Sequence, residues 1–304
     1  MATLVIRDFT DPACPWAFSA EPGRFRLRWL YEDEIEWQPR MVVLSERADE
    51  ADAKGFTPDR LAAALMTIQR RFGMPIAPHE RSRNAASLPA CRSVVAVRRH
   101  DPARDQALLR RLRIRAMAGA LLDEPETIAA AARDAGLDPA KVESWSAEPE
   151  TELALRADMA MARAPSEAAR ALDHKLADAG DGRRYTCPSY EIERLDGGAR
   201  LDLPGFQPVE AYEAAIANLV PELPRRDPPA DVEEVLRWAG EPLATVEVAA
   251  VCGMSTVKAR EALARVAEEE PVGADGYWSV RESAAAPVRG LGSAEPLAAA
   301  ASTL

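Results

Sequence analysis

A cysteine near the start of the chain carries the clearest chemical signal. Cys14 comes shortly after an apolar, β-branched run, Leu4–Ile6, and is followed at once by Pro15 and Trp16. Proline fits the first position of a helix, because the N–H that it lacks would have no intrahelical partner there. Cys14 would then lie at a helix N-terminus, where free N–H groups and the helix dipole lower the pKa of a thiol. The sequence therefore predicts a reactive thiolate at Cys14; the alternative is an inert cysteine in a site that only binds.

The other three cysteines are scattered along the chain, at Cys91, Cys187 and Cys252. Four cysteines are too few for a disulfide framework, and no pair has the close spacing of metal ligands. We therefore expect no metal site and no disulfide scaffold. Cys91 falls in an apolar helical stripe and is predicted to be a core residue, while Cys252 is predicted to be structural.

The elements that must position Cys14 form two groups, at the front and the rear of the first 220 residues. The expected elements are strand 3–9, helix 15–31 and strand 34–44 at the front, and strands 189–194 and 199–203 with helix 207–220 at the rear. The front order predicts a right-handed crossover between parallel strands. The tight turn Asp196-Gly197-Gly198 predicts a hairpin in the rear group. Together they predict a thioredoxin fold, an α/β architecture.

A long helical region separates the two groups. Apolar residues recur at helical spacing from Thr57-Pro58 onward, and the last helix of the region is expected at Ser166–Ala179. This pattern predicts a large helical insertion in the thioredoxin fold. The expected boundaries are 1–56 and 180–222 for the thioredoxin-fold domain, 57–179 for the inserted helical domain, 223–230 for a linker, 231–282 for a C-terminal domain and 283–304 for a disordered tail.

The C-terminal domain is predicted to be small, helical and winged-helix-like. Helical patterns at 231–239, 245–252 and 255–268 precede a stretch, 271–280, that could form a β-wing. Between Asp231 and Glu282 the chain has 11 acidic and 5 basic residues, a net charge of −6. Phosphate contacts need positive charge, so this balance favours a structural or protein-contact role over DNA binding.

Overall composition narrows the class of protein. The formal net charge of −11 argues against wholesale binding to nucleic acid or to an anionic membrane. No apolar run approaches 18 residues, so no transmembrane helix is expected. The N-terminus lacks a basic region followed by an apolar core, which predicts no signal peptide and a cytoplasmic location.

Three separated motifs resemble the DsbA-like, FrnE-type thioredoxin-fold oxidoreductases. Residues 11–16, Asp-Pro-Ala-Cys-Pro-Trp, resemble the family's active-site segment, and Thr186-Cys187-Pro188 looks like its cis-proline loop. Residues 204–208, Pro-Gly-Phe-Gln-Pro, followed by Tyr212, look like the segment that leads into its last helix. The likeness covers about residues 1–220 in the expected order. It implies thiol–disulfide oxidoreductase or isomerase activity, with Cys14 as the nucleophile.

This chain departs from the family pattern at two positions. Ala17 stands where the family's second active-site cysteine would be, which removes the usual CxxC disulfide. Cys187 precedes the expected cis-proline, where the family usually has valine or threonine. Three interpretations of Cys187 stay open: a substitute resolving cysteine for Cys14, a ligand that with Cys14 binds a metal or cluster between protomers, or a buried inert thiol.

The resemblance also implies which residues meet the substrate. Pro15, Trp16, Thr186 and Pro188 are expected to form the surface that contacts a disulfide-containing protein or small molecule. No cofactor is expected beyond glutathione or another low-molecular-weight thiol as co-substrate, and a homodimer is left open. Two alternatives remain: a kappa-type glutathione-dependent isomerase or transferase, and a degenerate module that binds extended peptide or protein.

Overall fold

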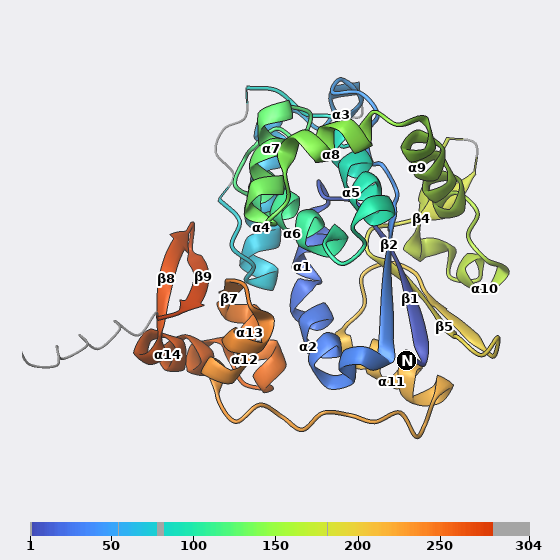
Figure 1. Ribbon diagram of the computed structural model, residues 1–304. Coiled ribbons are helices and arrows are strands. Elements are labelled where there is room, and N and C mark those ends of the chain that lie inside the picture. The colour runs from blue at the N-terminus through green and yellow to red at the C-terminus, as the bar shows by residue number, and fades with distance from the viewer. Residues whose placement is uncertain (1, 54, 78–81, 181, 282–304) are drawn as a thin grey trace, which may run out of the picture.

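The computed structural model describes residues 2–53, 55–77, 82–180 and 182–281 (Figure 1). Its central sheet has four strands in the order β2-β1-β5-β6. The strands are β1 (Leu4–Thr10), β2 (Ile35–Met41), β5 (Ser189–Arg194) and β6 (Arg200–Leu203). β1 pairs parallel with β2 and antiparallel with β5, and β5 pairs antiparallel with β6. The chain has the predicted thioredoxin fold.

β1 is the most deeply buried strand because both of its faces are covered. Leu4 and Ile6 point to one face, where they pack with residues of α2 (Glu21–Tyr31) and of α11 (Val209–Leu219). Phe9 points to the other face and stacks on Tyr185, with 4.2 Å between the ring centroids. A strand that is apolar on both faces and central in the sheet reads as a continuous apolar run, as the sequence predicted.

The front helix is divided in two. The sequence analysis predicted one helix over 15–31, whereas the structure has α1 (Pro15–Ser19) and α2 (Glu21–Tyr31). Pro22 explains the correction, since it cannot donate the hydrogen bond that a continuous helix needs at that position. The short α1 therefore carries the active-site segment, while α2 packs along the sheet.

The insertion consists mainly of helices that cover one end of the sheet (Figure 1). They are α3 (Glu50–Ala53), α4 (Pro58–Phe72), α5 (Leu88–His100), α6 (Asp105–Met117), α7 (Pro125–Asp134), α8 (Pro139–Ser146), α9 (Pro149–Ala162) and α10 (Glu167–Arg170). Asp158 of α9 fixes the insertion to β2, because its carboxylate accepts the backbone N–H of Met41 at 3.0 Å and an N–H of Arg98 at 2.9 Å.

The helix predicted over Ser166–Ala179 is wrong. Helix is limited there to α10 and a short 3-10 helix, η2 (Asp173–Lys175), while Leu176–Asp178 forms a strand, β3, which pairs antiparallel with β4 (Arg183–Tyr185). Glycines on both sides of position 181 favour a turn, and the hairpin satisfies the backbone groups that a helix would otherwise pair. This hairpin leads directly into the loop at Cys187.

Residues 232–280 form three helices and a three-stranded antiparallel sheet of order β7-β9-β8. The elements are α12 (Val232–Ala239), β7 (Leu243–Ala244), α13 (Thr245–Cys252), α14 (Thr256–Val266), β8 (Ala267–Val272) and β9 (Asp275–Val280). The helix predicted to reach Glu268 ends at Val266, because the following residues pair with β9. The winged-helix class stays a prediction, and the predicted tail, 283–304, lies outside the described residues.

The C-terminal unit shares its core with α2. Phe25 and Trp29, on the face of α2 turned away from the sheet, pack against apolar residues of α12, α13 and α14. The segment predicted as a linker also lies on α2: the N–H of Arg226 donates to the Leu30 carbonyl at 2.8 Å, and Trp29 Nε1 donates to the Asp227 carbonyl at 2.9 Å. Within the described residues, no helix is long and apolar enough to cross a membrane.

Candidate active site

Cys14 occupies the N-cap of α1, as predicted from Pro15. Its backbone N–H donates to the Asp11 carbonyl at 3.1 Å, and its own carbonyl accepts from Phe18 at 3.1 Å. The side chain is 5% exposed. The turn after β1 therefore presents the sulfur at the start of the helix, beside the N–H groups of Trp16 and Ala17.

The loop before β5 faces Cys14. The peptide bond between Cys187 and Pro188 is cis, and Cys14 Sγ lies 3.4 Å from the Cys187 carbonyl oxygen, to which the thiol donates. Thr186 holds this loop to the preceding segment, since its Oγ1 donates to the Lys175 carbonyl at 2.9 Å. The two cysteines therefore lie next to each other, although 173 positions separate them in the sequence. Cys187 is 7% exposed.

The two thiols have opposite acidities. The pKa of Cys14 is lowered, chiefly by a hydrogen bond from the Cys187 side chain and further by the N–H groups of Ala17 and Trp16, against the opposing effect of burial. The pKa of Cys187 is raised well above its ordinary value, first by burial and then by its interactions with Cys14. The protonated Cys14 thiol therefore donates to the Cys187 carbonyl, and after it ionises the Cys14 thiolate accepts a hydrogen bond from the protonated Cys187 side chain.

Asp11 positions this turn, a role that the sequence analysis missed. Its buried carboxylate accepts four hydrogen bonds: from the N–H groups of Ala13 and Leu44 at 2.7 and 2.8 Å, from Ser87 Oγ at 2.7 Å and from Cys91 Sγ at 3.4 Å. It ties the turn before Cys14 to the end of β2 and the start of α5. Cys91 is buried, as predicted, but it also takes part in this network. The signal in the sequence was only an Asp-Pro pair after a strand.

Three aromatic rings border the exposed side of the site. Trp16 is 38% exposed, in agreement with its predicted surface position. Its ring meets Phe72 of α4 edge to face at 5.5 Å and Phe206 at 6.1 Å, and the last two rings are 4.8 Å apart. Pro15 is half-buried beside Trp16, and Pro188 is buried. We name the Trp16, Phe72 and Phe206 rings the aromatic rim.

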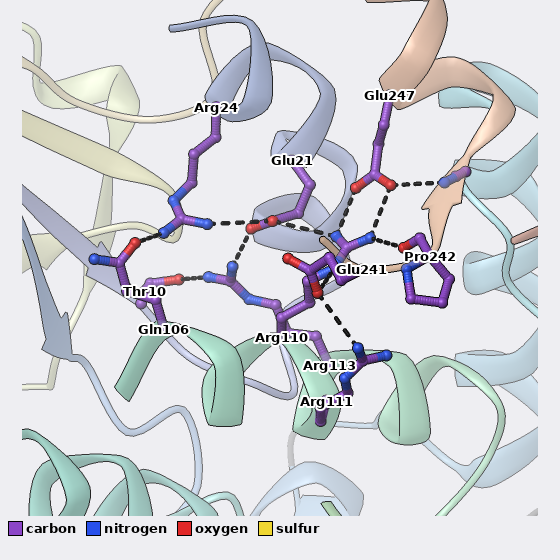
Figure 2. Close-up of polar contacts among 11 residues, drawn as sticks. Thr10, Glu21, Arg24, Gln106, Arg110, Arg111, Arg113, Glu241, Pro242 and Glu247 are labelled. Carbon is purple, nitrogen blue, oxygen red and sulfur yellow. Dashed lines mark hydrogen bonds and ion pairs between the residues drawn. The ribbon is translucent and has the colours of Figure 1, made fainter. Parts of the chain in front are cut away.

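A buried network of charges lies behind α1, and the sequence analysis did not find it (Figure 2). Glu21, the first residue of α2, is 1% exposed and pairs with Arg24, Arg110 and Arg113. Arg110 also forms a bidentate pair with Glu247 of α13, at 2.7 and 2.9 Å. Burial alone would raise the pKa of Glu21. The three arginines outweigh this effect, so the pKa of Glu21 lies below its ordinary value. The network joins the active-site helix pair to α6 and to the C-terminal unit.

The site offers thiol chemistry rather than metal ligands. In the part of the chain that the structure describes, no group of three His, Cys, Asp or Glu side chains is placed to hold a metal ion. All four cysteines are free thiols. A low-pKa sulfur at a helix start, opposite a cis-proline loop, is an arrangement for nucleophilic attack on a disulfide.

The fold and this site define a thioredoxin-fold protein with one nucleophilic cysteine at its first helix. The family model of the DSBA-like thioredoxin domain matches residues 5–165, and the chain belongs to that family, whose members are thiol–disulfide oxidoreductases or isomerases. The narrower FrnE-type subgroup stays a prediction.

Solved structures of low sequence identity share the fold. A candidate protein disulfide isomerase from Nitrosomonas europaea has a TM-score of 0.54 and 16% identity, over 72% of this chain and 98% of its own. A probable DsbA oxidoreductase from Streptomyces coelicolor has a TM-score of 0.51 and 20% identity, over 74% of this chain and 92% of its own. A comparison with curated proteins gives no match.

Proposed function

We propose that this protein is a thiol–disulfide oxidoreductase in which Cys14 is the nucleophile and Cys187 is the resolving cysteine. The observation that carries the proposal is the pair itself: the sulfur of Cys14 lies at a helix N-terminus and 3.4 Å from the Cys187 carbonyl oxygen. The Cys187 side chain also lowers the pKa of Cys14. Because Ala17 replaces the usual second cysteine, the cis-proline loop supplies the second thiol.

The first step needs only the Cys14 thiolate. Its sulfur attacks one sulfur of a substrate disulfide, the S–S bond breaks, and the other substrate sulfur leaves as a thiolate that takes a proton from water. The product is a mixed disulfide between Cys14 and the substrate.

In this proposal the backbone beside Pro188 pairs with an extended substrate, and the aromatic rim (Trp16, Phe72 and Phe206) contacts its side chains.

The second step releases the substrate. The Cys187 thiol gives its proton to the departing substrate sulfur, its own sulfur attacks Cys14 Sγ, and the bond between Cys14 and the substrate breaks. The substrate disulfide is thereby reduced by two electrons and a Cys14–Cys187 disulfide forms. Burial raises the pKa of Cys187 throughout, but the interactions with Cys14 that raise it further end once Cys14 is bonded to substrate, while Arg184 still lowers that pKa. Two molecules of a low-molecular-weight thiol such as glutathione then reduce the protein disulfide and leave as oxidised glutathione, which completes the cycle.

The experiment compares three variants in reduction of a fluorescent peptide disulfide with glutathione as reductant. We expect Cys187→Ser to lower turnover by about tenfold or more and to accumulate the Cys14 mixed disulfide, visible by intact-protein mass spectrometry. Cys14→Ser should form no adduct. Cys252→Ser is the matched control, since this half-buried cysteine lies on α13 and has a pKa raised to about 11 by burial.

If Cys187→Ser turns over at the wild-type rate, Cys187 is not the resolving cysteine and Cys14 acts by a monothiol route. Retention of glutathione by the wild-type protein without disulfide exchange would instead favour the kappa-type alternative. Peptide binding with neither adduct nor turnover would mean that the site only binds. A reducing, cytoplasmic location is part of the proposal, since the cycle needs a supply of reduced low-molecular-weight thiol.

A further inference from the structure

A polar cavity of about 450 Å³ lies between α2, β2, α6 and the turn after α12, outside the thiol site. Four arginines line it: Arg24 and Arg28 from α2, and Arg110 and Arg111 from α6. Figure 2 shows three of these side chains, Arg24, Arg110 and Arg111, converging from the two helices toward Glu21 and Glu241. A concentration of arginine in a chain of net charge −11 marks this cavity as a local positive site.

The carboxylates at this site are all engaged by arginines. Glu21 pairs with Arg24, Arg110 and Arg113, and Glu247 pairs with Arg110. Glu241 is shared between Arg110 and Arg111, at 3.0 and 3.5 Å. Asp134, which also lines the cavity, is bound to Arg115.

Arg28 is the group left without a counter-ion. Its guanidinium forms no hydrogen bond or ion pair with any described residue; it lies over the rings of Phe25 and Trp238, at 5.1 and 5.6 Å from their centroids. Burial and the neighbouring arginines lower the pKa of Arg28 to about 10, against the opposing effect of Glu241 and Glu21. A cation held at a cavity wall by aromatic rings, with no hydrogen bond or ion pair to a described residue, is available for an anionic ligand.

The charge balance suggests the class of ligand. Of the residues that line the cavity, four are arginines and two, Asp134 and Glu241, are acidic, so the lining has an excess of two positive charges. Two buried carboxyls, Asp8 and Asp105, interact with Arg24, and burial raises the pKa of each to about 6. A phosphate at neutral pH matches the excess at the lining better than a single carboxylate does.

We propose that this cavity binds a phosphate or diphosphate group, with Arg28 and Arg111 as the groups that contact the phosphoryl oxygens. Guanidinium groups present paired N–H donors that fit phosphate oxygens. Trp37 also lines the cavity, and its ring carries the Arg24 guanidinium at 5.1 Å from the ring centroid. The cavity volume falls within the range of small-molecule sites. The proposal is independent of thiol exchange, because it concerns other residues and a binding reaction.

The test is calorimetric titration of the full chain with inorganic phosphate, pyrophosphate and citrate. We expect pyrophosphate to bind and to raise the melting temperature, phosphate to bind more weakly, and citrate to bind least. Arg28→Gln and Arg111→Gln should each weaken pyrophosphate binding by about tenfold or more. Arg70→Gln, which removes the same charge from an exposed position on α4, should bind as the wild type does.

Three results would overturn the proposal. The first is that pyrophosphate does not bind to the wild type. The second is that Arg70→Gln weakens pyrophosphate binding as much as the two cavity variants do. The third is that citrate binds as tightly as pyrophosphate. Arg28→Gln removes the contacts with the Phe25 and Trp238 rings but no ion pair, so its melting temperature without ligand should fall by at most a few degrees. A normal melting curve together with unchanged pyrophosphate affinity in this variant would also contradict the assignment.

Discussion

Replacing Cys14 by serine is expected to lower the rate of disulfide reduction by on the order of a thousandfold or more. Serine keeps the size and position of the side chain but is not ionised at neutral pH, so the attacking thiolate is lost. The remaining thiol of Cys187 is a poor substitute, because burial raises its pKa well above the ordinary value. The rate should be measured with a peptide disulfide at fixed glutathione concentration.

The control for this prediction is again Cys252→Ser, which should retain the wild-type rate. The circular dichroism spectrum of Cys14→Ser should match that of the wild type, since Cys14 contributes to the fold mainly through its backbone hydrogen bonds. A Cys14→Ser variant that reduces the peptide within a few fold of the wild-type rate would show that another group performs the exchange.

Replacing Glu21 by glutamine is expected to lower the free energy of unfolding by about 3–5 kcal/mol. Glu21 is buried among Arg24, Arg110 and Arg113, and glutamine has nearly the same shape but no charge. In the variant, three buried guanidinium groups lose a negative counter-charge. Burying an uncompensated charge away from water lowers the free energy of unfolding. Urea unfolding at pH 7, followed by circular dichroism, measures the loss.

An exposed pair supplies the matched control. Glu126 pairs with Arg133 on α7 and is 79% exposed, so Glu126→Gln should cost less than about 1 kcal/mol. The pKa of Glu21 is lowered in the folded state, so its contribution is present above its ordinary pKa of 4.5 and is lost as the pH falls below that value. The gap between wild type and Glu21→Gln should therefore narrow in acid. Equal stability of the two variants at pH 7 would contradict the role given to the network.

Local signals in the sequence were sufficient for the thioredoxin fold and for the position of Cys14. The apolar run of β1 and the proline after Cys14 act over a few residues, so strand, turn and helix start were all predictable. The helix break at Ala20 was also encoded, in Pro22, but the pattern of apolar residues on both sides obscured it.

Long-range partners could not be predicted in this way. Asp11 appeared in the sequence as a strand breaker, and only the structure shows that Ser87 and Leu44 donate to its carboxylate. Glu21 and Glu247 looked like ordinary helix residues, because a single charged position does not reveal that its partner, Arg110, lies more than 80 positions away. The hairpin of β3 and β4 was missed for a similar reason: pairing between strands outweighs the local helical pattern.

We propose that Cys187 stabilises the Cys14 thiolate, and the pH dependence of Cys14 alkylation tests this directly. Alkylation with iodoacetamide, followed site by site by mass spectrometry, gives the midpoint of the Cys14 thiol. We predict a midpoint clearly below the ~8.5 of an unperturbed cysteine, and a rise in Cys187→Ala, which removes the hydrogen bond that most lowers the pKa of Cys14. A wild-type midpoint at or above ~8.5, or one unchanged by Cys187→Ala, would contradict the account.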